Sequence, residues 1–178
     1  MPAIVVSLTE QQRTWLEEIA PLAGKKMEKP MELTPERYLH RMLRLAAQTG
    51  NAVARIAERD GQFELRTKDG KTKNVPYVEG KERFDGAIYH IPPTTAPNGS
   101  IWLYFSDSLI AGLRWAGVLE TFEADITGKP IPWVTWEDWL NHYITRLLYD
   151  GKIWADSVTW EDEEEAAFRP KADPKGVK

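Results

Sequence analysis

Apolar and polar positions alternate at the start of the chain. Within Ala3–Leu8, the second, fourth and sixth side chains are large and apolar and would share one face of a strand. Thr9 and Gln12 follow with the spacing of a capping box. We therefore expect a short strand with one buried face, then a helix that begins at Thr9 and ends near Gly24.

A second helical pattern follows a charged connector. Thr34 precedes Pro35, and proline is favoured in the first helical turn because its missing N–H has no partner there in any case. Apolar residues then recur at helical spacing to about Gln48. Gly50–Asn51 predicts a break, after which Ala52–Glu58 resumes as a short helix.

The middle of the chain is typical of strands. Phe63–Thr67 and Thr72–Val78 flank an Asp69–Gly70 pair, a strong hairpin signal because both residues accept positive φ. Further strands are predicted over Ala87–Ile91 and Ser100–Phe105. The same periodicity also predicts strands over two later segments, Val118–Ile126 and Ile153–Trp160.

Two later helices have recognisable ends. Ser106 can cap a helix that runs to about Ala116, and Thr135 can cap one that ends at Gly151. The second carries a broad apolar face. Its members are Trp139, Leu140, Tyr143, Ile144, Leu147 and Leu148.

These elements predict an α+β fold, with two N-terminal helices, a mainly antiparallel sheet that includes a basic hairpin, and a late amphipathic helix packed on the sheet. We expect one domain over residues 1–160, within which residues 1–50 form a possible strand–helix–helix subdomain. Residues 161–178 are expected to be an acidic, flexible tail, since their composition cannot bury a core.

Cysteine is absent from all 178 residues. That excludes a disulfide framework, thiolate zinc sites, iron–sulfur clusters and cysteine nucleophiles, and it favours a reducing cytoplasm. Met1–Leu8 has no basic flank and is not expected to be a signal peptide. The longest apolar stretch, Ser108–Leu119, contains Arg114 and is shorter than the roughly 20 residues of a membrane span, so no membrane partner is expected.

Charge is distributed unevenly along the chain. The formal net charge is −4. Residues 1–83 carry 15 Lys and Arg against 12 Asp and Glu, whereas residues 84–160 carry 4 against 9. A dedicated nucleic-acid binder would usually be strongly basic, so only a local basic patch remains compatible with that function.

Known catalytic and phosphate-binding motifs are missing. The sequence has no GxxxxGK[ST], GxGxxG, HExxH or GxSxG, and only three histidines. Asp138 and His142 are four residues apart on a predicted helix and could form a carboxylate–imidazole pair or two metal ligands. A surface ion pair near a helix start is the preferred interpretation, because such a pair arises easily by chance. We predict no catalytic residues, no cofactor and no metal.

The predicted hairpin is rich in cations. In a two-residue Asp69–Gly70 turn, Lys68 lies opposite Lys71 and Arg66 lies opposite Lys73. All four cations would then share one face and suit an anionic partner, such as a phosphate backbone or an acidic protein surface. The alternative is an exposed edge kept soluble by lysine.

The order strand AIVVSLT, helix, loop and helix TPERYLHRMLRLA resembles the ribbon-helix-helix family of dimeric DNA-binding proteins over about the first 47 residues. The resemblance implies a homodimer in which the strand pairs with its copy and its outward residues enter the major groove. Here those residues are Ala3, Val5 and Ser7, which lack the usual base-reading groups, and the connector is longer than the tight turn of the family.

Aromatic and acidic residues gather late in the chain. Seven of the eight tryptophans lie between Trp102 and Trp160. Trp136 falls at the edge of an apolar helix face, where it could be a partly exposed anchor, although packing in or beside the core is the preferred interpretation. Five consecutive acids follow and could meet a basic partner. They are Glu161, Asp162, Glu163, Glu164 and Glu165.

Together these features favour a non-catalytic protein-interaction module. We expect a small cytoplasmic regulator, inhibitor or assembly component, of the sort encoded by phages and mobile elements, that docks on a protein partner through charged and aromatic surfaces. One alternative is a nucleic-acid-associated protein that uses an N-terminal dimer and the basic hairpin. Another is a small enzyme with an unfamiliar site at Asp138 and His142.

Overall fold

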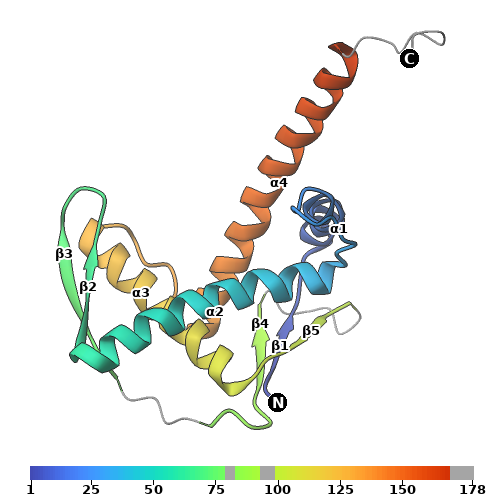
Figure 1. Cartoon of the computed structure of the whole chain (residues 1–178). Helices are drawn as coiled ribbons and strands as arrows, with labels where there is room; N and C mark the ends of the chain where they lie inside the picture. The colour runs from blue at the N-terminus through green and yellow to red at the C-terminus, as the bar shows by residue number, and fades with distance from the viewer. Residues whose placement is uncertain (79–82, 93–98, 169–178) are drawn as a thin grey trace, which may run out of the picture.

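The computed structural model describes residues 1–78, 83–92 and 99–168. Figure 1 shows the arrangement of its elements, with a hairpin set apart from a small sheet. In chain order the described elements are β1 (Ala3–Val6), α1 (Glu10–Lys25), α2 (Pro35–Asp60), β2 (Gln62–Arg66), β3 (Thr72–Pro76), β4 (Ile88–Ile91), β5 (Ile101–Tyr104), α3 (Asp107–Thr127) and α4 (Trp136–Phe168). The predicted α+β class is confirmed.

The N-terminal helices begin where the sequence predicts. Thr9 and Gln12 form both hydrogen bonds of a capping box at the start of α1. The hydroxyl of Thr34 accepts from the backbone N–H of Arg37 at the start of α2, directly before Pro35. Local capping therefore fixes both helix starts.

The main sheet has three strands in the order β4-β1-β5, with β1 parallel to β4 and antiparallel to β5. Ile4 and Val6 point into the core, and Ala3 and Val5 are also buried, on the opposite face of the sheet. Both edges of β1 are hydrogen-bonded within the chain. The homodimeric ribbon implied by the family resemblance therefore has no free β1 edge on which to form.

One buried core joins this sheet to all four described helices. It contains Ile4 and Val6 of β1, Leu16 and Ile19 of α1, Leu39 and Leu43 of α2, Ile110 and Leu113 of α3, and Trp139, Leu140 and Ile144 of α4. The late helix α4 contacts β4, as predicted for a helix packed on the sheet. Within the described residues, β2 and β3 contribute nothing to this cluster.

The predicted break at Gly50–Asn51 is wrong, because α2 runs without interruption for 26 residues. Gly50 lies where α2 crosses α3, and a Cβ built on it would lie 1.9 Å from the carbonyl oxygen of Gly112. Glycine is thus required at position 50 because the backbones of α2 and α3 approach closely there. Packing between the helices offsets the roughly 1 kcal/mol that an interior glycine costs a helix.

The strand predicted over Val118–Ile126 is also wrong, because α3 continues to Thr127. Apolar residues in this segment recur at Val118, Phe122 and Ile126, a spacing of four that suits a helix better than a strand. The helix ends at Gly128, whose φ of 68° is the left-handed conformation favoured by glycine.

A single helix replaces the last predicted helix and strand. The prediction that Gly151 ends the helix and that Ile153–Trp160 is a strand is wrong, since α4 extends for 33 residues to Phe168. Gly151 faces α1, where a Cβ would lie 2.9 Å from Cδ1 of Ile19. Its small size therefore serves helix packing rather than helix termination.

Candidate functional site

The cations of the hairpin do not share one face. Leu65 lies opposite Lys73 and Arg66 opposite Thr72, one residue out of the predicted register. The backbone N–H of Thr67 donates to the carbonyl of Lys71 at 2.9 Å, so three residues form the loop rather than two. A slip of one residue moves a side chain to the other face of a strand. The prediction that Arg66 and Lys73 face each other was therefore wrong.

Each hairpin cation has its own surroundings. Lys73 turns toward α3, where its Nζ is 2.5 Å from Oδ2 of Asp125 and 5.2 Å from the ring centre of Phe122. Arg66 pairs with Glu64 at 3.2 Å on the outward face. Lys68 is exposed at the loop. The four predicted partner-binding cations are thus dispersed, and one of them holds the hairpin to α3.

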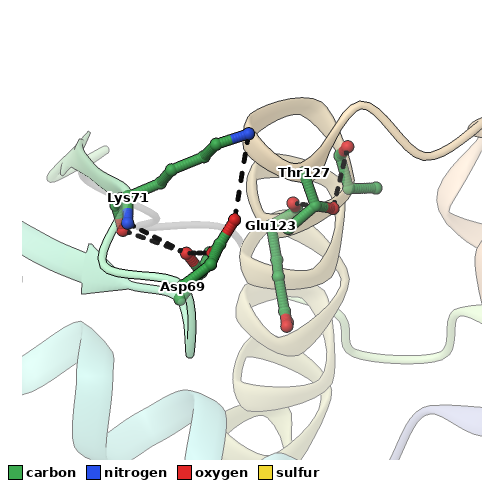
Figure 2. A network of polar contacts seen from close by, with 6 residues as sticks. Asp69, Lys71, Glu123 and Thr127 are labelled. Carbon is green, nitrogen blue, oxygen red and sulfur yellow. Dashed lines mark hydrogen bonds and ion pairs between the residues drawn. The ribbon is translucent and has the colours of Figure 1, made fainter.

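Figure 2 shows the hairpin tip beside the last turns of α3. Lys71 lies 3.9 Å from Oδ2 of Asp69, and the Thr67 hydroxyl donates to the same carboxylate. That hydroxyl and the charge of Lys71 lower the pKa of Asp69. The tip is therefore an internally paired turn, with Gly70 at a φ of 83° completing it.

The acidic residues 161–165 belong to α4. All five are exposed, and Asp162 forms an ion pair of 2.9 Å with Lys26, just after α1. The rest of the predicted tail, residues 169–178, lies outside the described residues. The acids are thus presented on a helical surface up to Phe168.

The distal half of α4 carries an exposed apolar stripe, which sequence reasoning missed. Tyr149, Ile153 and Trp160 are 57%, 55% and 62% exposed. Their spacing of four and seven residues places them on one helix face, opposite the buried Ala155 and opposite Gly151, which packs toward Ile19 of α1. At the start of the stripe, the Tyr149 ring also meets that of Trp15 of α1 edge-on, with centroids 6.5 Å apart. Figure 1 shows this part of α4 projecting past the sheet, with α1 beside it. We call residues 149–168 the α4 arm.

Trp136 is half-buried at the start of α4. Its ring meets that of Tyr89 edge-on, with centroids 5.0 Å apart, and the Arg114 guanidinium lies 5.6 Å from its centroid. Its indole Nε1 is buried and has no hydrogen-bond partner among the described residues. Trp136 therefore joins α4 to β4 and α3, and part of its ring lines a cavity of about 380 Å³.

Asp138 and His142 have separate roles. The Asp138 carboxylate accepts hydrogen bonds from the backbone N–H groups of Thr135 (3.2 Å) and Val134 (3.3 Å), and these bonds lower its pKa. The His142 ring packs 5.1 Å from that of Trp133. Asp138 thus caps α4. Over the part of the chain that the structure describes, no group of three His, Asp or Glu residues is arranged to hold a metal ion.

A cleft opens between α2 and α3 where they leave their crossing at Gly50 and Gly112. It holds a cavity of about 430 Å³, whose lining includes Arg55 of α2, Arg114 and Trp115 of α3, and Tyr77 after β3. The sequence places one glycine of this crossing, Gly112, inside a predicted helix and the other, Gly50, at a predicted helix break, so it did not indicate that the two helices cross there.

A search of protein-family models found no match to this chain, and searches of the curated proteins and the solved structures found none with significant similarity. Among the helices of the described residues, none is both long and apolar enough to cross a membrane. The functional argument therefore rests on the surfaces described above.

Proposed function

We propose that the protein is a non-catalytic interaction module that docks on a protein partner through the α4 arm. The observation that carries the proposal is the apolar stripe of Tyr149, Ile153 and Trp160 at the side of an exposed acidic run. An amphipathic helix that lays such a stripe into an apolar groove is a common mode of recognition. The acids specify a partner whose groove is flanked by Lys and Arg.

The biological setting that fits this activity is a small cytoplasmic regulator, inhibitor or assembly component of the phage or mobile-element type. A cytoplasmic location is supported by the absence of cysteine from the sequence. No catalytic step is assigned. The capping role of Asp138 supports this view, because its carboxylate accepts hydrogen bonds from the backbone N–H groups of Val134 and Thr135, directly before α4.

The test compares two double variants in a binding experiment. The immobilised chain is incubated with two halves of an extract of its native host, one of them treated with nuclease, and the captured protein is purified and titrated against the wild type. Ile153→Ser/Trp160→Ser should weaken binding about 30-fold or more, since buried tryptophan anchors contribute at least about 2 kcal/mol. Trp102→Ser/Tyr104→Ser removes exposed aromatics of β5 instead and should leave the affinity unchanged.

Equal loss in both double variants would contradict docking through the α4 arm. Loss of the captured species on nuclease treatment would instead favour the second candidate, a nucleic-acid-associated protein. That candidate is supported by Arg37, Arg41 and Arg44, which line one cavity of about 290 Å³ on α2. Its signature would be an affinity that falls steeply with salt and falls further in Arg41→Gln/Arg44→Gln.

A further inference from the structure

The outer face of the main sheet, which is turned away from the core, carries two exposed aromatic rings. Trp102 and Tyr104 of β5 are 48% and 55% exposed, and their rings stack with centroids 6.5 Å apart. The alternate residues of β5 are buried in the core, so the pleat of the strand holds the aromatic pair on the opposite face. At the other edge of the sheet, Ile88 and His90 of β4 are exposed as well. Both edges of this face are therefore open to solvent in the described part of the chain.

Three arginines lie together on the N-terminal half of α2. Arg37, Arg41 and Arg44 are exposed and line one cavity of about 290 Å³. Among the described residues none of the three forms an ion pair, and the described lining of the cavity contains no Asp or Glu. Guanidinium groups without a carboxylate partner favour an anion, and phosphate suits them because it can accept two parallel hydrogen bonds from one arginine.

His40 brings the arginines and the aromatic pair to the same edge of the sheet. It follows Arg37 by three residues and precedes Arg44 by four, so it shares a helix face with both. Its Nε2 donates a hydrogen bond of 3.0 Å to the backbone carbonyl of Tyr104, and its ring stacks on that of Phe105. Since β5 is an edge strand, this contact places the three arginines beside the free edge of the strand that carries the exposed rings.

We propose that this surface, which we call the β5 platform, binds single-stranded nucleic acid. It consists of Trp102, Tyr104, Arg37, Arg41 and Arg44. Proteins that bind single strands combine a basic surface for the phosphates with exposed rings on which bases stack. A duplex keeps its bases paired and stacked on one another, so it would offer the platform only its phosphates.

The β5 platform is separate from the α4 arm. The proposal gives the second candidate function a site and a form of nucleic acid, and it does not depend on docking through the α4 arm. The chain would then bind a protein at one surface and a nucleic-acid strand at another.

The test uses four fluorescent probes of about 12 nucleotides, a length within the range covered by single-strand binding surfaces. They are an oligothymidylate, an oligouridylate, an abasic strand with the same phosphates, and the oligothymidylate paired with its complement. Each is titrated with the full chain and followed by fluorescence anisotropy. The thymidylate, the uridylate or both should bind saturably, and their ratio shows whether the platform prefers DNA or RNA. The abasic strand and the duplex should bind at least about tenfold more weakly, because they offer no base for stacking.

A pair of single variants tests the rings. Trp102→Leu should weaken binding of the preferred strand about tenfold, since one base loses its stacking partner. Trp160→Leu removes a ring of similar exposure from the α4 arm and should leave the affinity unchanged. Trp102 lies outside the buried core, so its replacement should leave the fold intact, which circular dichroism checks.

A pair of double variants tests the arginines. Arg41→Gln/Arg44→Gln should lower the slope of log K against log salt concentration by about 1.4, because each phosphate contact on a single strand contributes about 0.7. Arg55→Gln/Arg59→Gln changes the net charge equally at the other end of α2 and should leave the slope unchanged.

Three results would overturn the proposal: no saturable binding of either single strand, equal affinity for the abasic strand, or the same affinity in Trp102→Leu as in Trp160→Leu. The second result would indicate a surface that binds any polyanion. Ile153→Ser/Trp160→Ser, the double variant that tests the α4 arm, should bind the single strand as the wild type does. Failure of one proposal can therefore be told apart from failure of the other.

Discussion

Asp138 stabilises α4 through its charge, and this makes stability depend on pH in a defined direction. Its pKa is lowered in the folded chain, chiefly by the N–H of Thr135 and then by that of Val134. Folding therefore favours the ionised form. The contribution is complete above the ordinary aspartate pKa of about 3.9 and is lost as the pH falls through the lower folded value.

The substitution Asp138→Asn should thus destabilise the protein at pH 7 and matter less at pH 2.5. Urea unfolding of wild type and variant at both pH values measures the difference. Glu137→Gln, one residue earlier in the same helical turn, is the matched control, because no hydrogen bond of its carboxylate caps the helix. An effect of Asp138→Asn that stays constant between the two pH values would contradict the assigned charge.

Gly50 is a second residue whose substitution should change the stability of the protein. Its missing side chain permits the contact with Gly112, so Gly50→Ala forces two backbones apart. We expect a loss of about 3 kcal/mol or more in the free energy of unfolding, measured by urea denaturation. Thr49→Ala, on the exposed side of the same turn, should change stability by no more than about 0.5 kcal/mol.

At the scale of single elements, the α4 arm depends on its contact with α1. Ala155 is 4% exposed between the two helices, and Lys152 pairs with Glu18 across them. Ala155→Arg should release the arm while the rest of the chain stays folded. Hydrogen exchange should then show lost protection in residues 155–168 and unchanged protection in β1. The control variant Ala155→Ser should keep the protection of both segments. Loss of protection in β1 as well would mean that the arm is part of the global folding unit.

The hairpin is an element whose attachment can be measured. Lys73 and Asp125 join β3 to α3 through one ion pair in which both side chains are partly exposed, at 40% and 60%. A double-mutant cycle with Lys73→Met and Asp125→Asn should give a coupling energy of no more than about 1 kcal/mol. A larger value would show that solvent screens this pair less than its exposure implies.

Element starts were easier to predict from sequence than element ends. Thr9, Thr34 and Ser106 cap helices as expected, because capping depends on a few neighbouring residues. Gly50 and Gly151 were misassigned as helix breaks because their role is set by Gly112 and Ile19, which are distant in sequence. The predicted register of the hairpin was wrong for a related reason, since an Asp–Gly pair is compatible with both a two-residue and a three-residue loop.

For the candidate surfaces too, local features could be predicted from the sequence, whereas features that depend on distant contacts could not. The acidic run of residues 161–165 is visible in the sequence, but its display beside Trp160 depends on the continuation of α4 through Gly151. The cleft lined by Arg55 and Arg114 could not be predicted, because it exists only where α2 and α3 cross. Sequence patterns thus indicated the charged groups but not the surfaces that they form.

For the molecule as a whole, the continuous core predicts a single cooperative unfolding transition. The buried cluster joins β1, β4 and β5 to α1, α2, α3 and α4. Urea transitions followed by tryptophan fluorescence and by circular dichroism should therefore coincide. The hairpin is the exception, since its described residues lie outside that cluster, and its amides should exchange at a lower free energy than those of β1. Separate fluorescence and dichroism midpoints would indicate two folding units.

The central place of β1 also determines when the protein can fold during its synthesis. Ala3 is synthesised before its partners, Ile88 in β4 and Tyr104 in β5. The apolar strand β1 therefore stays unpaired on its β5 edge until the chain has been extended by about 100 further residues. Such distant pairings slow folding, so the nascent chain has to keep Ile4 and Val6 from associating with other chains in the meantime.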